Sequence, residues 1–266
     1  WSGDESETLL SGGKGQGLFR LLKHGARVPP FFVVLPEDSQ KTAVEAYNTQ
    51  RWDCVAVRSS ALGEDGVEHS FAGMYESVLG VRNASGLKKA ISACRKSSQS
   101  ERVLSYRMLH NLEDTPVAVI VQEMIEGEVS GFMVTHDPIN PDAVLISAGY
   151  GLGEGVVQGI TPCDTIRVQG RSVEREITVK DTAIRLRGTA TTEFAIEEER
   201  QERCCLSEDQ SLRLAKEGRR LADAFGRPLD IEWTLRDNVF YLLQARPITQ
   251  ELPSGRKLLW DNANII

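Results

Sequence analysis

Apolar positions recur along the chain at two different spacings, which predict a mixture of helices and strands. Leu18, Leu21 and Leu22 fall on one side of a helix, so we expect a helix from Lys14 to His24 that stops at Gly25. A longer helical pattern over 207–225 follows Ser207, an N-cap residue type, and ends before Gly226-Arg227-Pro228. Shorter helices are expected over 40–51, 87–97 and 101–109.

Runs of apolar and β-branched residues predict the strands. The strongest runs cover 117–125, 129–135 and 143–148, with others at 31–35, 54–58, 164–168, 172–179 and 183–186. Because antiparallel-looking strand pairs are mixed with helices, we expect an α+β protein in two lobes. We place the lobes at residues 1–115 and 116–250, and we expect 251–266 to be a linker to a further domain.

The last predicted strands form a hairpin that gathers polar side chains on one face. Asp230 and Glu232 are two residues apart, as are Gln244 and Arg246, and the turn lies at Arg236-Asp237-Asn238. Hard oxygen ligands suit Mg²⁺ and a guanidinium suits phosphate oxygens, so this patch is suited to a divalent metal with a polyphosphate. A solvated amphipathic hairpin held by a Glu–Arg cross-strand pair is the alternative.

Composition restricts the class of protein. The chain has 266 residues, 41% of them hydrophobic and 26% charged, as in ordinary globular proteins. The net charge of -7 argues against a general nucleic-acid binder, although it leaves room for a local anion site. No apolar run approaches the roughly 20 residues that span a bilayer, and no signal peptide is visible. Five scattered cysteines without a C-x-x-C pair predict reduced thiols and a cytoplasmic protein.

Two segments are candidate phosphate sites. Gly12-Gly13-Lys14-Gly15-Gln16-Gly17 precedes a predicted helix, where glycines let the backbone approach an anion, and it is not a Walker A loop. A flexible entry loop is the alternative. Arg58, with Ser59 and Ser60, ends an apolar strand and is either a phosphate clamp or a structural arginine.

Other segments are less specific. The loop from Ser70 to Ser77 is either a cover over a ligand or a surface turn, and Gln122-Glu123-Met124 is either a base-binding strand edge or plain core. His136 next to Asp137 is typical of a turn, although it also suggests acid–base chemistry. Glu154 lies in the glycine-rich segment 149–159, which lacks a Rossmann context.

Taken together, these segments resemble the nucleotide-binding domain shared by phosphoenolpyruvate synthase, pyruvate phosphate dikinase and rifampin phosphotransferase. The resemblance covers about residues 10–250, and its motifs occur in the family's order. They are Gly12-Gly13-Lys14-Gly15, Arg27-Val28-Pro29-Pro30, Val57-Arg58-Ser59-Ser60-Ala61, Ser70-Phe71-Ala72-Gly73, Val121-Gln122-Glu123-Met124, Thr135-His136-Asp137-Pro138, Gly151-Leu152-Gly153-Glu154 and Gln244-Ala245-Arg246-Pro247.

The resemblance implies a two-lobed ATP-grasp-like fold that holds ATP and Mg²⁺, and it implies a role for each matching residue. Lys14, Arg58 and Arg246 would bind phosphates, Glu232 and Gln244 would hold Mg²⁺, and Asp230 would support them. Glu123 and Ile125 would contact adenine, mainly through their backbone, and Gly73 would belong to a loop that covers the phosphates. Thr135 would lie on the cleft side of its strand end.

The resemblance also implies the reaction. The β-phosphoryl of ATP would pass to a histidine on a separate domain, with AMP and phosphate as products. The family's acceptor histidine motif is missing here, because His24, His69, His110 and His136 lie in other contexts. We therefore expect an incomplete enzyme that needs a histidine domain as its partner. From the net charge and the lack of a long apolar run, we expect no binding to nucleic acid or membrane. An ATP-grasp ligase that yields ADP and a non-catalytic nucleotide-binding scaffold are the alternatives.

Overall fold

The computed structural model describes residues 5–61, 75–110 and 113–248, which form two compact units. The first unit comprises Trp1–Arg20, Pro29–Met124 and Gly188–Ala190, and the second comprises Leu21–Val28, Ile125–Arg187 and Thr191–Ile266. The division falls after Met124 rather than after residue 115, because the strand Val117–Glu123 pairs inside the first sheet.

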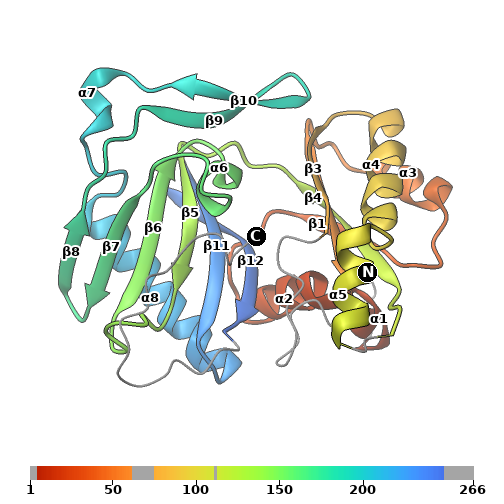
Figure 1. Ribbon diagram of the computed structural model, residues 1–266, viewed down its shortest axis with the longest axis horizontal. Helices are drawn as coiled ribbons and strands as arrows, with labels where there is room; N and C mark the ends of the chain where they lie inside the picture. The colour runs from red at the N-terminus through yellow and green to blue at the C-terminus, as the bar shows by residue number, and fades with distance from the viewer. Residues whose placement is uncertain (1–4, 62–74, 111–112, 249–266) are drawn as a thin grey trace. The chain divides into compact units, whose positions relative to one another are not determined.

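The first unit is built on a four-stranded antiparallel sheet with strand order β1-β4-β2-β3. Its strands are β1 (Phe31–Val34), β2 (Val55–Ala61), β3 (Ser77–Val81) and β4 (Val117–Glu123). The helices that begin in this unit are α1 (Glu5–Leu10), α2 (Gly12–Lys23), α3 (Gln40–Thr49), α4 (Ala84–Ser97) and α5 (Glu101–His110). Helices α3 and α4 lie on one side of the sheet (Figure 1).

The alternation of side chains along β2 separates a core face from a polar face. Val55 and Val57 join Val119 and Val121 of β4 in a buried cluster with residues of α3 and α4. Arg58 and Ser60 have the opposite parity, so they lie on the other face of the same strand. The sequence of β2 therefore positions an arginine opposite a well-packed core.

The second unit is built on a six-stranded antiparallel sheet with strand order β12-β11-β5-β6-β7-β8. Its strands are β5 (Val129–Val134), β6 (Val144–Tyr150), β7 (Asp164–Gln169), β8 (Ser172–Glu176), β11 (Leu229–Arg236) and β12 (Val239–Pro247). A separate two-stranded ribbon contains β9 (Thr182–Arg187) and β10 (Ala190–Ala195). The helices are α6 (Gly153–Val157), α7 (Glu198–Gln201) and α8 (Glu208–Phe225).

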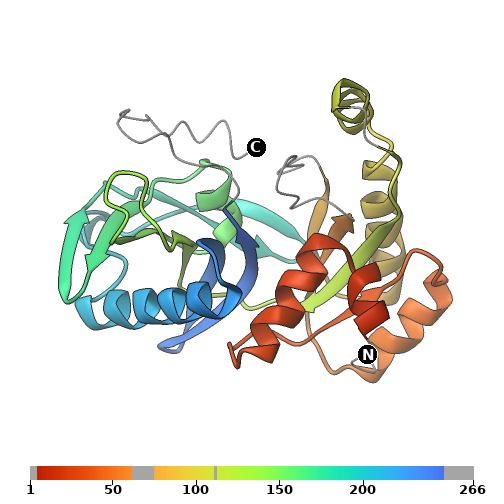
Figure 2. The same cartoon turned by 90° about the horizontal axis from the view of Figure 1, so that it is seen from below.

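Helix α8 covers one face of this sheet, as Figure 2 shows. Ser207 begins it with a capping box formed with Gln210, and Gly226 ends it with a left-handed φ of 71°. Gly218 lets the helix approach the sheet, since a Cβ there would lie 2.8 Å from Sδ of Met133. Met133 thus marks the helix-covered face, and residues of opposite parity on β5 lie on the other face.

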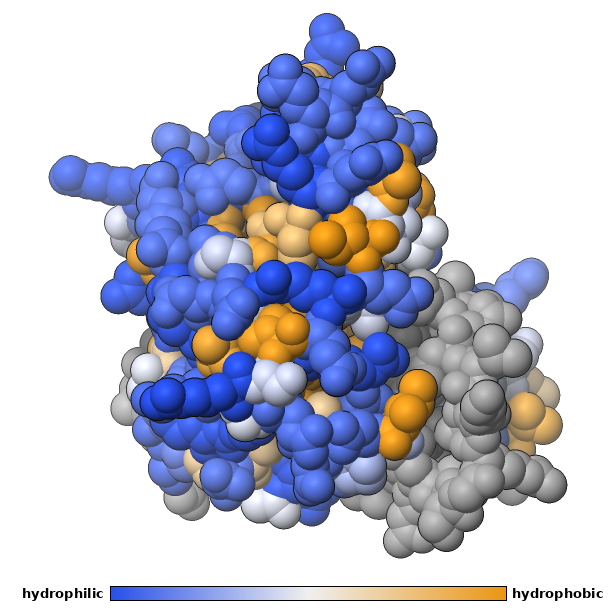
Figure 3. Space-filling model, turned by 90° about the vertical axis from the view of Figure 1, so that its left-hand side faces the viewer, coloured by the Kyte–Doolittle hydropathy of each residue, from blue (hydrophilic) through white to orange (hydrophobic). Residues whose placement is uncertain are grey.

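The outer edge of this sheet is charged. Strand β8 pairs only with β7 within the sheet, and Glu174, Arg175 and Glu176 on it are exposed. The face of the molecule at this edge is mostly hydrophilic, with small, separate apolar areas (Figure 3). Charged side chains on an edge strand disfavour pairing with another chain.

The expected α+β class is confirmed, and most expected elements are present within two or three residues of their predicted bounds. Five short elements among the described residues were not expected: α1, β3, α6, β10 and α7. Strand β2 continues through Ser59 and Ser60, where we expected it to end. The expected loop over 63–73 and the linker over 251–266 lie outside the described residues.

Candidate functional site

In the first unit, the glycine-rich segment is packed directly on β2. Gly12 has a φ of +73°, and a Cβ there would lie 2.2 Å from the carbonyl oxygen of Ser60. The backbone N–H of Gly15 donates a hydrogen bond of 3.1 Å to Oγ of Ser60. Only glycine permits this approach, so the sequence Gly12-Gly13-Lys14-Gly15 fixes the start of α2 against the polar face of β2.

These contacts bring the elements that carry Lys14 and Arg58 together. Both residues are half-buried, and Ser60, which anchors α2, is two residues from Arg58 on the same face. On the core face, Oγ of Ser59 donates a hydrogen bond of 2.9 Å to the carbonyl oxygen of Glu76. The first unit thus brings the start of α2, which carries Lys14, against the face of β2 that carries Arg58.

Sequence reasoning did not assign a role to Ser60. Its contact with Gly15 joins residues 45 positions apart. No local pattern in the chain points to that pairing. The pair Ser59-Ser60 after the apolar run Val55-Ala56-Val57 was the signal that the sequence offered.

In the second unit, the predicted hairpin is confirmed. Asp237 and Asn238 both have positive φ values, 51° and 59°, as in the turn that favours right-twisted hairpins. The register pairs Asp230 with Arg246 and Glu232 with Gln244, and an irregularity follows Glu232. Ile231 pairs with Met133 on the face covered by α8, so the four polar side chains extend from the opposite face.

The first of these cross-strand pairs is an ion pair. Nε and Nη2 of Arg246 donate hydrogen bonds of 3.0 and 2.8 Å to the same carboxylate oxygen, Oδ2 of Asp230. The two side chains are 22% and 21% exposed, so water screens the pair only in part. The alternative interpretation of the hairpin included a cross-strand pair between a glutamate and an arginine; the structure contains such a pair with Asp230 as the acid.

The second pair has the chemistry of a cation site. Gln244 is 6% exposed, and its Oε1 is buried without a hydrogen-bond partner among the described residues. A buried acceptor without a donor is costly, and a bound cation removes that cost. Glu232 lies directly across the ladder and supplies a carboxylate, so the pair fits a hard divalent ion with oxygen ligands. Residues 5–61, 75–110 and 113–248 contain no cluster of three or more His, Cys, Asp or Glu side chains that could hold a metal ion.

Thr135 lies apart from this patch. Its Oγ1 accepts a hydrogen bond of 2.8 Å from the N–H of Leu229. Its Cγ2 would lie 3.3 Å from a Cβ built on Gly218 of α8. The structure therefore places Thr135 on the helix-covered face, opposite Asp230 and Glu232.

The remaining site candidates lie in several parts of the chain, and their roles stay predictions. Glu123 ends β4, and its N–H donates to the carbonyl oxygen of Pro30 at 2.8 Å. Ile125 begins the segment Ile125–Arg187 of the second unit, and its carbonyl oxygen accepts a hydrogen bond from the N–H of Gly127. Gly73 lies outside the described residues. Asp137 is buried, and its carboxylate accepts hydrogen bonds of 2.9 Å from Nε of Arg167 and from the N–H of Ile139.

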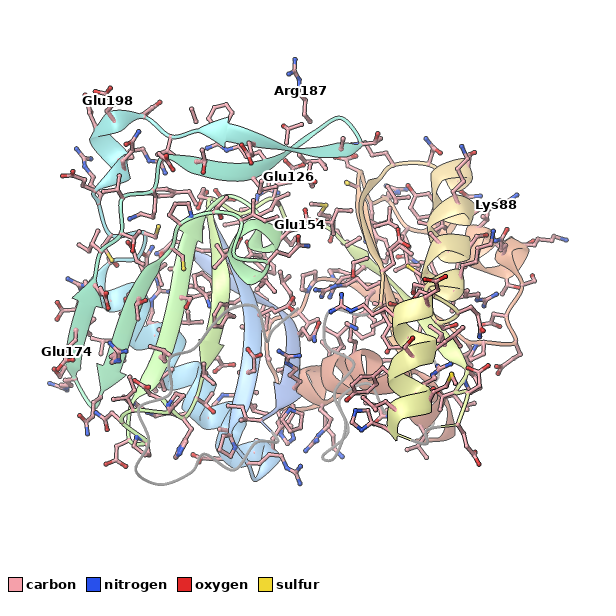
Figure 4. The ribbon with its side chains drawn as sticks, in the orientation of Figure 1. Lys88, Glu126, Glu154, Glu174, Arg187 and Glu198 are labelled. Atoms are coloured by element: carbon pink, nitrogen blue, oxygen red, sulfur yellow. The ribbon has the colours of Figure 1, made fainter. Side chains whose placement is uncertain are left out.

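Glu154 is a further acidic side chain on the unit's polar side. It projects from α6, labelled in Figure 4, and a Cβ on the neighbouring Gly153 would lie 3.6 Å from Cβ of Ser130. Ser130 has the parity opposite to Met133, and its Oγ lies 2.8 Å from Oγ1 of Thr234. Oε2 of Glu154 is buried without a hydrogen-bond partner in the described part of the chain. The Gly151-Leu152-Gly153-Glu154 motif was the sequence signal for this position.

Burial makes four of the five cysteines poor candidates for nucleophilic chemistry. Burial raises the pKa of the Cys94 thiol to about 12, and the negative charge of Glu76 adds to this shift. Burial also raises the pKa of Cys163, Cys204 and Cys205. Thiols with raised pKa values are poor nucleophiles at neutral pH.

No described helix is long and apolar enough to cross a bilayer.

Comparison with known proteins adds independent information. A family model described as "Pyruvate phosphate dikinase, AMP/ATP-binding domain" matches residues 35–257. The rifampicin phosphotransferase of Bacillus subtilis is 38% identical over 229 residues, which is 83% of this chain and 26% of that protein. The rifampicin phosphotransferase of Streptomyces sviceus is 39% identical over 204 residues, with coverages of 74% and 24%. A probable phosphoenolpyruvate synthase of Methanocaldococcus jannaschii is 36% identical over 237 residues, with coverages of 84% and 20%.

The chain thus spans 20–26% of the length of these three relatives. Among solved structures, the VanG D-Ala:D-Ser ligase of Enterococcus faecalis matches with a TM-score of 0.48 and 11% identity, over 93% of this chain and 55% of that one. The L-amino acid ligase of Bacillus licheniformis matches with a TM-score of 0.46 and 16% identity, over 89% and 43%.

Proposed function

Because the chain belongs to the AMP/ATP-binding domain family of pyruvate phosphate dikinase, we propose that it is the ATP-binding module of a dikinase-type phosphotransferase. The module would bind ATP in an ATP-grasp-like fold and donate its β-phosphoryl group to a histidine on a separate domain. The observation that carries the proposal is the hairpin of the second unit, where a buried amide oxygen without a donor lies beside a guanidinium. Those are the two groups that a metal–polyphosphate complex requires.

The proposed nucleotide contacts are described for each unit by itself. In the first, Lys14 and Arg58 would bind phosphate oxygens, as a point charge and a planar fork respectively. In the second, Arg246 would bind phosphate, while Glu232 and Gln244 would hold Mg²⁺. The backbone at Glu123 and Ile125 would contact adenine, and Gly73 would belong to the segment that covers the phosphates.

These residues would position the phosphates and neutralise their negative charge. A histidine nitrogen would form a bond to the β-phosphorus as the bond from that phosphorus to the bridging oxygen of AMP breaks, and AMP would leave with the electron pair. Hydrolysis would then release the γ-phosphoryl group as inorganic phosphate. Mg²⁺, when bound, would neutralise phosphate charge. The three cations would orient the chain of phosphates so that the β-phosphorus faces the incoming nitrogen.

The test is a transfer assay with ATP labelled at the β-phosphoryl group and a histidine-bearing domain from a family member supplied in trans. We expect label on that domain, with AMP and phosphate as products. Arg246→Ala should abolish the transfer, while Arg236→Ala, an exposed arginine on the turn of the same hairpin, should leave it unchanged.

Three results would contradict the proposal. Release of ADP without label on the histidine domain would favour a ligase-type reaction. Tight ATP binding without any transfer would favour a scaffold. Equal activity of the two arginine variants would remove Arg246 from the site.

A further inference from the structure

Lys180 and Asp164 form an ion pair in the interior of the second unit. Both side chains are 0% exposed, and Nζ of Lys180 donates a hydrogen bond of 2.6 Å to Oδ1 of Asp164. The ammonium group also donates to the carbonyl oxygen of Thr178 at 2.6 Å, and the backbone N–H of Lys180 donates to the carbonyl oxygen of Gln201 at 3.0 Å. Charges buried this deeply persist only where hydrogen bonds satisfy both groups. Neither residue is among the proposed nucleotide contacts, so the role of the pair lies in the segments that it joins.

The carboxylate of Asp164 joins two segments that are far apart in the sequence. Oδ1 also accepts a hydrogen bond of 3.1 Å from the N–H of Thr178, and Oδ2 accepts one of 2.7 Å from the N–H of Cys205. Thr178 precedes the ribbon β9–β10, and Cys205 follows it. We call the two segments, 178–181 and 201–205, the neck of the ribbon. The buried ion pair closes this neck.

Beyond the neck, β9 contacts the glycine-rich loop, which we define as residues 151–154. This loop leads into α6, beside β9 (Figure 1). The carbonyl oxygen of Ile184 accepts a hydrogen bond of 2.8 Å from the N–H of Leu152, and Gly151 forms a parallel β-bridge with Ile184. A Cβ on Gly151 would lie 2.3 Å from that carbonyl oxygen, so only glycine permits this approach. The position of the loop therefore depends on the position of β9.

The glycine-rich loop also contacts the polar face of the six-stranded sheet. Oγ of Ser130 donates a hydrogen bond of 2.6 Å to the carbonyl oxygen of Gly151 and lies 2.8 Å from Oγ1 of Thr234. Thr234 is two residues from Glu232 on β11, so the two side chains extend from the same face. The loop is thus held on one side by β9 and on the other by the face that carries the candidate cation ligand.

We propose that Lys180 and Asp164 are positioning residues, which close the neck of the ribbon and so keep the glycine-rich loop in place on the face that carries Glu232. The part of the inference that concerns nucleotide binding rests on the proposed function. Loss of the pair opens the neck, β9 moves away from the loop, and the loop no longer supports the polar face. Binding of nucleotide with Mg²⁺ is then weakened although every residue that would contact them is still present.

Native-state hydrogen exchange, read residue by residue by NMR, tests the hold on the loop. The amide of Leu152 donates across the contact between loop and ribbon, and the amide of Ile196 donates to Asp181 across the base of the ribbon. In Lys180→Met, we expect both to exchange at least about tenfold faster than the amide of Met133 in β5, and with little dependence on urea, because they open locally. Exchange of all three at one rate, with the same urea dependence, would mean that the pair is lost only with the whole unit.

Nucleotide affinity gives a readout that a merely structural role would not move. The dissociation constant of a non-hydrolysable ATP analogue with Mg²⁺ would be measured by calorimetry, at a temperature at which circular dichroism shows each variant folded. We expect Lys180→Met to weaken binding about tenfold. Arg167→Met is the matched control, because it removes an ion pair of 2.9 Å to the buried Asp137 without touching the neck. It should change the affinity by less than about twofold.

A second variant carries the test if Lys180→Met does not fold. That substitution leaves the carboxylate of Asp164 buried without its cation, which is strongly destabilising. Lys180→Met combined with Asp164→Asn removes both charges and keeps a side-chain oxygen that accepts from one of the two backbone N–H groups. Its loop amides and its nucleotide affinity should change in the same direction as in the single variant.

The outcomes separate the inference from the proposed function. Equal loss of affinity in Lys180→Met and Arg167→Met, or loop amides that exchange only with the whole unit, would overturn the positioning role and leave the ATP-binding proposal standing. Failure of the parent chain to bind the analogue would overturn the proposed function, while the exchange measurement would still decide whether the pair holds the loop.

Discussion

Substitution of Gly12 by alanine tests how the glycine-rich segment is packed on β2. Gly12 and Gly25 have nearly the same φ, +73° and +72°, so alanine at either position carries the left-handed backbone cost of about 1–2 kcal/mol. Their surroundings differ. A Cβ at Gly12 would lie 2.2 Å from the carbonyl oxygen of Ser60, whereas nothing lies within 4 Å of a Cβ at Gly25.

The magnitude follows from that difference. Inserting a methyl group into a packed site typically adds about 1–3 kcal/mol. We therefore expect Gly12→Ala to lower the free energy of unfolding by about 2–5 kcal/mol, and Gly25→Ala by about 1–2 kcal/mol. Urea unfolding followed by circular dichroism measures both. Gly12→Ala should also weaken binding of an ATP analogue, because it displaces the start of α2 and with it Lys14.

The comparison has a clear refuting result. Equal destabilisation by the two substitutions would mean that the segment does not contact Ser60 as described. Unchanged nucleotide affinity in a destabilised Gly12→Ala variant would mean that the contact is structural and does not position Lys14.

Three further predictions concern separate parts of the chain. Glu232→Gln should raise the Mg²⁺ concentration needed for nucleotide binding, measured by calorimetric titration, and an unchanged midpoint would remove Glu232 from the metal site. Ser207→Ala should destabilise the chain by about 1 kcal/mol in urea unfolding, because it removes the capping box of α8, and no loss would show that the cap is dispensable. Native Cys94 should resist iodoacetamide at pH 8.5, because burial raises its pKa to about 12, and should react once urea unfolds the chain. Because the Cys94 pKa is higher in the folded chain than in the unfolded chain, its contribution to the free energy of unfolding is fully present below about pH 9. The free energy of unfolding should therefore fall as the pH rises from 9 toward 12, and a flat profile would contradict the assignment.

The hairpin shows what sequence patterns predict well. Period-two spacing placed Asp230 and Glu232 on one face, and Asp237-Asn238 is a pair that tolerates the positive φ values of a tight turn. Counting outward from the turn would pair Glu232 with Leu243, so the turn alone does not predict the register of the polar patch. The irregularity between Glu232 and Trp233 shifts the register by one residue and pairs Glu232 with Gln244. The structure adds which acid pairs with Arg246, a choice that depends on side-chain length and on the irregularity after Glu232.

Tertiary contacts account for what the patterns missed. Leu22 was expected on the apolar side of α2 but is 44% exposed, because the buried stripe of that helix follows Leu18 and Leu21. The face of Thr135 was decided by strand parity with Met133, which became visible only once α8 was known to cover Met133. Strand β10 consists mainly of exposed residues, so it has no apolar alternation to reveal it.

The central claim is that this chain binds ATP together with Mg²⁺. Calorimetric titration of the chain with a non-hydrolysable ATP analogue, with and without Mg²⁺, tests it most directly. We expect binding at micromolar strength that depends on Mg²⁺ and is lost in Arg246→Ala but kept in Arg236→Ala. Absence of binding under both conditions, or binding indifferent to Mg²⁺ and to Arg246, would contradict the account.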